Sequence, residues 1–299
     1  FGPNATVSQD LEPEYITVSE DSKTAWVSLQ ENNAIAKLDI ESATITDVYG
    51  LGYKRHDLAK NAFDASNEDG GINIKNWPTL GMYQPDAIAS YQRGKATFII
   101  TANEGDARDY DGYSEEVRVK DLELDTKAFP NATELQLKPE LGRLKTTTAN
   151  GDNDGDGDHD EIYSYGARSF SIWNENGKLV FDSGSQFEDF LAQYQNNGFD
   201  VWTDSRSDDK GPEPESITTG QLGDNTYAFI GLERTSGLFI YNISSPYKPK
   251  SVGYIDLKDN GDVGPEGLVF IPRNSNSGWL IVTNEISNTV STYEITIDD

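Results

Sequence analysis

An internal repeat constrains the fold of this chain more than any other feature of its sequence. Four times, a proline followed by an acidic residue opens a stretch of apolar runs that are separated by Gly, Asn, Asp or Pro. Short runs rich in Val, Ile, Thr and aromatic residues between such breakers predict β-strands joined by tight turns. Repeats of this length indicate an array whose units bury their apolar faces against their neighbours. The copies begin at Pro13, Pro85, Pro214 and Pro265.

The copy in residues 214–257 shows the unit most clearly, because it holds four β-rich runs in succession. Four sequential antiparallel strands are the size and content of one propeller blade. We therefore predict an all-β fold, a β-propeller of four-stranded antiparallel blades, with about four blades in a single domain that spans residues 1–299. The expected blades cover residues 13–50, 85–184 with a long insertion at 111–165, 214–257 and 265–297.

The last predicted blade ends after its third strand, close to Asp299. A propeller often closes when an N-terminal strand completes its last blade, but residues 1–12 carry no clear strand pattern. We therefore expect these 299 residues to be the later part of a larger propeller. Its further blades would come from the same precursor or from another chain.

Two acidic positions recur in register within the repeat. One follows the proline, and the other ends the second strand. Antiparallel strands joined by a tight turn bring such positions to the same end of a sheet. Around a common axis the carboxylates would form a ring, which favours a cation site; alternatively, each acid only helps to start its strand by accepting backbone N–H bonds. The first positions are Glu14, Asp86, Glu215 and Glu266, and the second are Glu31, Glu104, Glu233 and Glu285.

The charge of the chain narrows the choice of partners. It carries 24 Lys and Arg residues against 51 Asp and Glu residues, a net charge of −27. That field repels nucleic acid and anionic membranes and attracts cations, so we expect no nucleic-acid partner. No apolar run is long enough to span a bilayer. The acidity and the many Asn, Asp and Gly turns indicate an extracellular, cell-surface or periplasmic location.

The sharpest local motif is an aspartate- and glycine-rich loop at residues 152–161. Ca²⁺ takes six to eight oxygen ligands, and alternate residues of this loop fall at the ligand positions of an EF-hand, with Gly157 at the sharp turn. Position twelve is Tyr163 instead of the closing Glu, so Glu161 or a carboxylate from elsewhere has to complete the site. A solvated acidic turn is the alternative. The expected ligands of a structural Ca²⁺ are Asp152, Asp154, Asp156, Asp158, Asp160 and Glu161.

Three basic residues stand close to the recurrent acids. Arg108 lies in the acidic stretch after Glu104, Lys210 lies in a mixed-charge loop before the third copy, and Arg234 directly follows Glu233. A basic side chain among carboxylates is either their ion-pair partner or a clamp for an anionic ligand. The sequence leaves both roles open.

Six segments also carry a resemblance to a known family: residues 11–16, 83–88, 102–106, 166–173, 209–215 and 229–234. Over nearly its whole length the chain is similar to the secreted choice-of-anchor I propeller family. Some members are described as atypical alkaline phosphatases, and animal relatives as mesenchyme-specific cell-surface glycoproteins. The resemblance implies a seven-bladed propeller in which further blades precede the present chain.

The first functional hypothesis is a metal-dependent phosphomonoesterase, similar to propeller alkaline phosphatases and phytases. In such enzymes clustered carboxylates hold Ca²⁺ ions that neutralise the phosphate and activate water. Two histidines and no cysteine argue against zinc or Ser-His chemistry. Arg108, Lys210 and Arg234 would contact the phosphate of a phosphorylated small molecule. The carboxylates that hold the catalytic metal would be Glu14, Asp86, Glu104, Glu215, Glu233 and Glu266.

The second hypothesis is a non-catalytic, calcium-stabilised module of the cell surface or matrix that binds a partner such as a surface polymer. The large insertions and the acidic charge suit it equally well. A phosphatase assay with and without Ca²⁺ distinguishes the two hypotheses, because only an enzyme would lose activity when Glu215→Gln removes a carboxylate.

Overall fold

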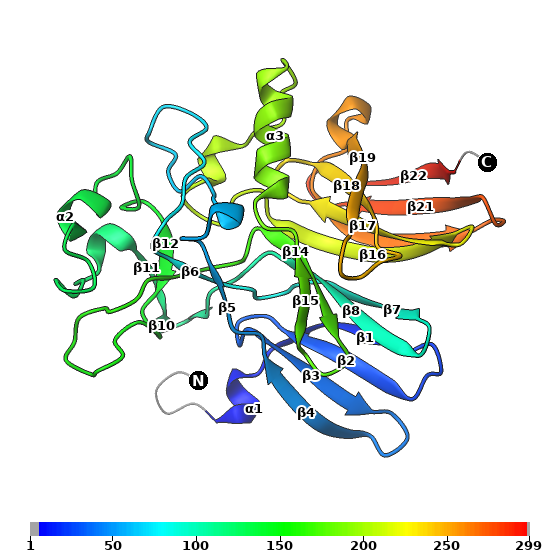
Figure 1. Cartoon of the computed structure of the whole chain (residues 1–299), viewed down its shortest axis with the longest axis horizontal. Coiled ribbons are helices and arrows are strands. Elements are labelled where there is room, and N and C mark those ends of the chain that lie inside the picture. The colour runs from blue at the N-terminus through cyan, green and yellow to red at the C-terminus, as the bar shows by residue number, and fades with distance from the viewer. Residues whose placement is uncertain (1–5, 298–299) are drawn as a thin grey trace.

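Antiparallel sheets whose strands pair in chain order form the frame of the protein (Figure 1). The computed structural model describes residues 6–297, and the predicted domain limits at residues 1 and 299 lie outside this range. The first sheet consists of β1 (Pro13–Val18), β2 (Thr24–Leu29), β3 (Ala34–Asp39) and β4 (Thr44–Gly50). The second consists of β7 (Ile88–Arg93), β8 (Ala96–Asn103), β14 (Ser169–Asn174) and β15 (Leu179–Asp182).

The third and fourth sheets follow one another closely in the chain. The third consists of β16 (Pro214–Leu222), β17 (Asn225–Leu232), β18 (Gly237–Asn242) and β19 (Lys250–Asp256). The fourth consists of β20 (Pro265–Pro272), β21 (Ser277–Asn284) and β22 (Thr289–Thr296). The four-stranded antiparallel sheets that the repeat predicts are therefore confirmed for three copies, and the fourth copy has three strands as expected.

The four strands that begin the sheets lie side by side in the order β1, β7, β16 and β20. Hydroxyl groups link neighbouring sheets at this row. Ser28 Oγ donates to the carbonyl of Asp86 at 2.8 Å, and Ser216 Oγ donates to the carbonyl of Pro265 at 3.2 Å. The recurrent proline–acid pairs are therefore brought into one region of the molecule.

The largest apolar core lies between the second and third sheets, where α3 (Gln186–Asn196) packs against them. The spacing of Phe187 and Leu191 predicts one apolar helix face, and both side chains are fully buried. The ring of Phe187 lies 4.7 Å from that of Phe239 in β18. Burial of one such side chain contributes about 1.5–3 kcal/mol relative to leaving it exposed. The helix therefore joins the two sheets that carry half of the recurrent acids.

Two segments that interrupt the repeat, residues 51–84 and 105–167, fold together into what we call the insertion layer. Its apolar core is its own, with Phe63, Trp77 and Leu144 among the buried residues. The insertions expected at residues 57–84 and 111–165 both lie within this layer, and nothing in the sequence indicates that they share one core. Its five-stranded sheet contains β5 (Tyr53–Arg55), β6 (Leu80–Met82), β11 (Glu116–Arg118), β12 (Lys145–Thr147) and β13 (Tyr163–Ser164).

Two glycines hold the ends of the second inserted segment together, directly after β8 and shortly before β14. A Cβ atom on Gly105 would lie 2.1 Å from the nitrogen of Gly166, and one on Gly166 would lie 1.9 Å from the carbonyl oxygen of Glu104. Both glycines have a positive φ, +94° and +69°. Only glycine tolerates both the conformation and the contact. The second sheet therefore keeps its strand order although a long segment separates β8 from β14.

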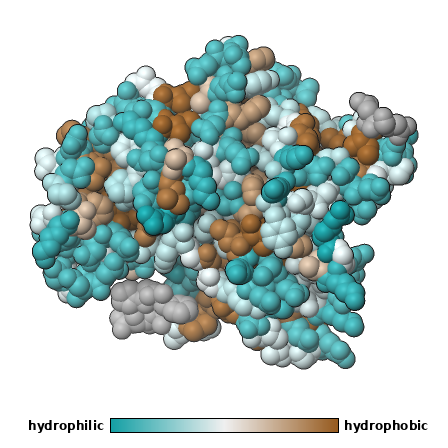
Figure 2. Space-filling model, viewed as in Figure 1, coloured by the Kyte–Doolittle hydropathy of each residue, from teal (hydrophilic) through white to brown (hydrophobic). Residues whose placement is uncertain are grey.

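Short elements complete the described part of the chain. Those outside the sheets are α1 (Val7–Asp10), α2 (Ala132–Leu135), the 3₁₀ helices η1 (Ala59–Asn61), η2 (Val119–Asp121), η3 (Asp204–Arg206) and η4 (Leu257–Asn260), and a ribbon of β9 (Asp109–Tyr110) and β10 (Tyr113–Ser114). Between residues 6 and 297, no helix has both the length and the apolar character that a membrane crossing requires. Hydrophilic residues cover much of the face in Figure 2.

Candidate metal centre

The strands that carry the recurrent acids start with an irregularity in their pairing. In β1, β16 and β20 the register against the next strand shifts within the first residues, next to the proline–acid pair. Such bulges turn a side chain out of the regular alternation and are common beside functional sites. In these three sheets they help an acid at the start of the first strand to face the same region as the acid after the second; β7 pairs with β8 without such a shift.

The residue before the proline adopts a left-handed conformation in three of the four copies. These residues are Gln84 (φ +42°), Glu213 (φ +53°) and Gly264 (φ +74°). A residue before proline favours extended conformations, and a left-handed residue other than glycine costs of order 1–3 kcal/mol. The side chain of Gln84 offsets this cost by donating to the carbonyl of Asp106 at 2.6 Å and accepting from the N–H of Gly166 at 3.2 Å. The acids therefore follow strained but firmly held turns.

Two groups of three carboxylates form the heart of the site. In each group one oxygen from every residue lies within 4.8 Å of the others. The first group is Asp86, Glu104 and Glu215, and the second is Glu104, Glu213 and Glu233. Glu104 belongs to both, and Glu266 lies close enough to Glu215 to contribute to raising its pKa. We call these residues the central acidic cluster: Asp86, Glu104, Glu213, Glu215, Glu233 and Glu266.

The carboxylates of the central acidic cluster are crowded and largely withdrawn from water. Burial and the charge of Glu104 raise the pKa of Asp86 to about 8. Burial and the charges of Glu104 and Glu233 raise the pKa of Glu215 in the same way. One carboxyl oxygen of Glu215, Oε2, is buried and has no hydrogen-bond partner among the described residues. The cluster thus combines crowded negative charge with an acceptor oxygen that no side chain of the described residues satisfies.

Basic side chains neutralise part of this charge. Lys210 donates to Glu104 and lies 3.7 Å from Glu213. Arg234 contacts Glu213 at 3.0 Å, and Arg206 contacts it at 2.7 Å. The six carboxylates therefore face three basic side chains, and the excess charge is negative. Glu213 is not among the predicted carboxylates, although the proline–acid pattern occurs twice in a row at residues 212–215.

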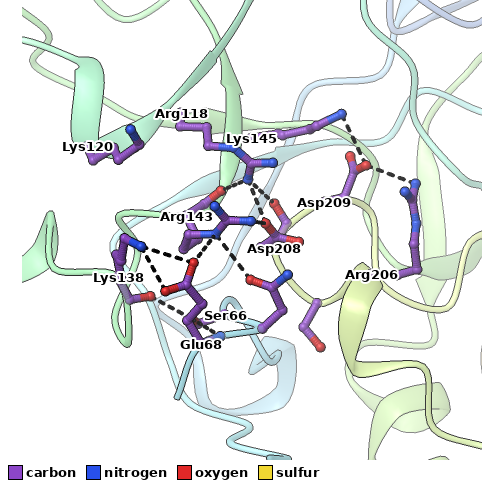
Figure 3. A network of polar contacts seen from close by, with 12 residues as sticks. Ser66, Glu68, Arg118, Lys120, Lys138, Arg143, Lys145, Arg206, Asp208 and Asp209 are labelled. Carbon is purple, nitrogen blue, oxygen red and sulfur yellow. Dashed lines mark hydrogen bonds and ion pairs between the residues drawn. The ribbon is translucent and has the colours of Figure 1, made fainter. Parts of the chain in front are cut away.

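Ion pairs tie the loop before β16 to the insertion layer (Figure 3). Arg118 and Arg143 converge on the same carboxyl oxygen of Asp208, at 2.7 Å and 2.8 Å. Lys145 reaches Asp209 at 3.2 Å. Both aspartates are almost fully buried. The loop that supplies Arg206 and Lys210 to the site is therefore fixed from the side of the insertion layer.

The acids of the first and last copies differ from those of the middle two. Glu14 belongs to neither carboxylate group and is exposed, although its charge acts on Asp86. Burial raises the pKa of Glu31 to about 7, and the charges of Glu12 and Glu14 add to the effect. Glu285 is exposed. Of the predicted catalytic carboxylates, the structure thus gathers Asp86, Glu104, Glu215, Glu233 and Glu266, and leaves Glu14 at the margin.

Arg108 lies away from the central acidic cluster. Its guanidinium is buried and contacts Asp10 at 2.9 Å and Glu115 at 3.5 Å. It lines a different cavity of about 440 Å³, together with Glu31 and Asn32. In this structure Arg108 is an ion-pair partner and not a free anion clamp.

The aspartate-rich loop forms two further carboxylate groups that share Asp160. One contains Asp152 and Asp154, and the other contains Asp158 and Asp125. The sequence gives no signal for Asp125, because it lies in a separate stretch that a parallel bridge between Leu124 and His159 brings to the loop. Oxygen ligands of this kind suit Ca²⁺.

Two predicted ligands of the loop make other contacts. Glu161 accepts hydrogen bonds from the Tyr163 hydroxyl at 2.6 Å and the Asn153 amide at 3.1 Å. The carboxylate of Asp156 accepts from the backbone N–H of Asp158 at 3.2 Å. Neither Asp156 nor Glu161 belongs to the two carboxylate groups of the loop.

Comparisons with known proteins find one domain family and two relatives to which this chain is similar. The model of the choice-of-anchor I domain matches residues 2–246. The mesenchyme-specific cell surface glycoprotein of Strongylocentrotus purpuratus is 27% identical over 335 residues, covering 98% of this chain and 41% of that protein. Gigasin-3a of Magallana gigas is 36% identical over 184 residues, covering 52% of this chain and 64% of that protein. The chain thus spans less than two thirds of the length of either relative.

Similarity to solved structures is weak. The structure of U3-55K covers 96% of this chain and 54% of its own, with 8% sequence identity and a TM-score of 0.34. At this score the likeness carries no argument about fold or function.

Proposed function

The chain belongs to the choice-of-anchor I domain family, and on that premise we propose that it is a secreted, calcium-binding module of the cell surface or matrix. The name of the sea-urchin relative, a cell surface glycoprotein, supports an extracellular or cell-surface location. The excess of acidic residues is consistent with this location and with cations as ligands.

The proposed architecture is a β-propeller of which this chain supplies about four blades. The row of first strands in the order β1, β7, β16 and β20 supports it, because propeller blades place their first strands around the axis. The outer sheets expose apolar residues on these strands, for example Ile16 in β1 and Val269 in β20. Further blades that pack against these two ends would cover them.

The observation that carries the proposal is the pair of carboxylate groups that share Glu104. Hard oxygen ligands without nitrogen or sulfur suit Ca²⁺ or a similar divalent cation. A bound cation would neutralise the excess negative charge of the central acidic cluster and would give the unpartnered oxygen of Glu215 a ligand. Asp86, Glu104 and Glu215 would hold the ion.

The aspartate-rich loop is proposed as a second, structural Ca²⁺ site. Its carboxylate groups meet at Asp160, and Asp125 ties the loop to another part of the insertion layer. A cation there would neutralise the repulsion among exposed aspartates and fix the loop.

The phosphomonoesterase hypothesis ranks second in this proposal. Phosphate binding needs basic groups that are free to turn toward the substrate. Lys210 and Arg234 are near the carboxylates, but each is engaged by them. A binding module does not need free basic side chains, and we therefore prefer this hypothesis to the enzyme. Hydrolysis of p-nitrophenyl phosphate with and without Ca²⁺ tests the enzyme directly.

Calorimetric titration of the chelator-treated protein with Ca²⁺ tests the central site. We expect at least two classes of site, and Glu104→Gln should weaken the central one by roughly a hundredfold, because this carboxylate serves both groups. The matched control is Glu285→Gln, which alters a recurrent but exposed acid outside the cluster. The proposal is wrong if Glu104→Gln and Glu285→Gln bind Ca²⁺ alike.

A further inference from the structure

A cavity of about 440 Å³ lies between the first sheet and the insertion layer. Val48 and Gly50 of β4 line one side, and Tyr53 of β5 and Met82 of β6 line the other. No member of the central acidic cluster lines it. Its volume falls within the range of small-molecule sites, which is about 300–1,000 Å³. The cavity is therefore a separate place where a small ligand fits.

Three of the charged groups at this cavity are already paired with one another. The guanidinium of Arg108 contacts Asp10 at 2.9 Å and Glu115 at 3.5 Å, and all three side chains are almost fully buried. The two oxygens of Glu115 accept hydrogen bonds from the Arg108 N–H and from the Thr147 hydroxyl, each at 2.9 Å. This group is therefore engaged within the chain, and its two carboxylates outweigh its one guanidinium.

Two neighbouring side chains of the cavity wall, Glu31 and Asn32, are not fully engaged. Glu31 Oε2 and Asn32 Oδ1 are buried and have no hydrogen-bond partner among the described residues. The amide nitrogen of Asn32 donates to Asp10 at 2.7 Å, so its oxygen is the end that lacks a partner. A buried acceptor without a donor costs free energy. Both residues are only partly buried as a whole, so these oxygens can turn toward a donor in the cavity.

A primary ammonium group is the donor that suits these oxygens. It carries three N–H donors and a positive charge, so a carboxylate and one or two neutral oxygens satisfy it. Ca²⁺ takes six to eight oxygens, which is more than the wall offers once Asp10 and Glu115 are engaged. Apolar side chains of the wall would contact a short aliphatic chain attached to the ammonium: Leu11, Val48, Leu51 and Met82.

We propose that this cavity binds a small primary alkylammonium ion, whose N–H groups donate to Glu31 and Asn32 and whose aliphatic part packs against the apolar wall. The net charge of −27 attracts any cation to the chain and does not select this one. Selection comes from the two acceptor oxygens and from the apolar side chains beside them. The site is separate from both proposed Ca²⁺ sites, so it stands or falls independently of the proposed function.

Titration of the whole chain with n-butylammonium in chelator, followed by amide NMR spectra, tests the inference. The titration is run at pH 8, because burial raises the pKa of Glu31 to about 7 and the carboxylate has to be ionised. We expect the amide signals of Gly50 and Gly52, which line the cavity, to shift along one binding curve. No shift at these residues overturns the inference.

Two matched ligands separate the contributions. n-Butanol has the aliphatic chain without the charge, and tetramethylammonium has the charge without N–H donors. Each should bind at least roughly tenfold more weakly than n-butylammonium, because each lacks the charge-assisted hydrogen bond to Glu31. Equal affinity of either ligand contradicts the proposed recognition.

A variant locates the ammonium. Glu31→Gln should lower the affinity for n-butylammonium by roughly tenfold, because the amide keeps the shape of the side chain and removes its charge. The matched control is Glu285→Gln, which changes the acid at the same place in the last copy of the repeat, exposed and away from the cavity. The site is refuted if the two variants bind n-butylammonium alike. The ligand series uses the parent chain and decides the question even if Glu31→Gln does not fold.

Discussion

Glu213 is a fully buried carboxylate that holds two arginines, at 2.7 Å and 3.0 Å, and lies 3.7 Å from Lys210. Its backbone is left-handed and precedes a proline, so it combines conformational strain with a concentration of charge. Because the strain persists, its contacts must outweigh it. Glu213 therefore fixes the positions of three basic side chains, Arg206, Lys210 and Arg234, beside the candidate metal centre.

We predict that Glu213→Gln lowers the free energy of unfolding by about 2 kcal/mol, because three basic side chains lose a charged hydrogen-bond acceptor in a buried place. Urea denaturation of both proteins measures the change. Glu285→Gln serves as the control and should stay within about 0.5 kcal/mol of the parent, as exposed substitutions usually do. A loss at Glu213 no larger than this would contradict the assigned role.

The raised pKa values predict an unusual pH dependence in the absence of metal. Asp86, with a pKa raised to about 8, and Glu31, with a pKa raised to about 7, hold protons in the folded chain that they release near pH 4 in the unfolded chain. The folded state therefore binds more protons, and stability in chelator should fall as pH rises from about 5 to 8.

Denaturation at a series of pH values tests this prediction, with Asp86→Asn expected to flatten the dependence. Added Ca²⁺ should restore stability at pH 8, because the ion binds the ionised carboxylates. A free energy of unfolding in chelator that rises steadily from pH 5 to 8 would show that the carboxylates are not crowded as described.

Among the helices and strands, those that pair with a sequence neighbour could be predicted, and those that pair across a long stretch of chain could not. The meanders are predictable because neighbouring strands pair through short turns that the sequence marks. The sheet of the insertion layer is not, since β6 and β13 have three and two residues and pair across a long stretch of chain. Asp125 escapes prediction for the same reason, whereas Glu213 carried the proline–acid signal and could have been found.

We predict that the aspartate-rich loop needs bound Ca²⁺ to resist proteolysis. In chelator we expect faster proteolysis within residues 152–161, because exposed aspartates without a cation repel each other and loosen the loop. Asp160→Asn should cause the same sensitivity in the presence of Ca²⁺, since Asp160 belongs to both carboxylate groups.

Mass spectrometry of the fragments locates the cleavage. Asp224→Asn, in the exposed turn between β16 and β17, is the control and should leave the pattern unchanged. Equal cleavage of the loop with and without Ca²⁺ would rule out a structural ion there.

The whole molecule carries a net charge of −27, and hydrophilic residues cover much of the face in Figure 2. Mutual repulsion at this density opposes the compact state and is screened by salt. The Debye length falls from about 30 Å at 0.01 M to about 8 Å at 0.15 M ionic strength. The repeat predicted the antiparallel sheets, but the side-by-side order of β1, β7, β16 and β20 depends on contacts between sheets that join residues far apart in sequence.

We therefore expect the thermal midpoint in chelator to rise by several degrees over this range of NaCl, since the relief of repulsion among 51 acids outweighs the weakening of the surface ion pairs. Differential scanning calorimetry at several salt concentrations measures it, and KCl should act like NaCl because the effect is one of screening. A falling midpoint would mean that the ion-pair network dominates.

The two glycines at Gly105 and Gly166 have a consequence for engineering. They bring the two ends of the segment 105–167 to within contact distance, so β8 and β14 can pair whatever the length of chain between them. A foreign segment whose own two ends lie close together could therefore be inserted between Gly105 and Gly166. The ends of such a segment would lie beside Glu104, the carboxylate that both groups of the central acidic cluster share.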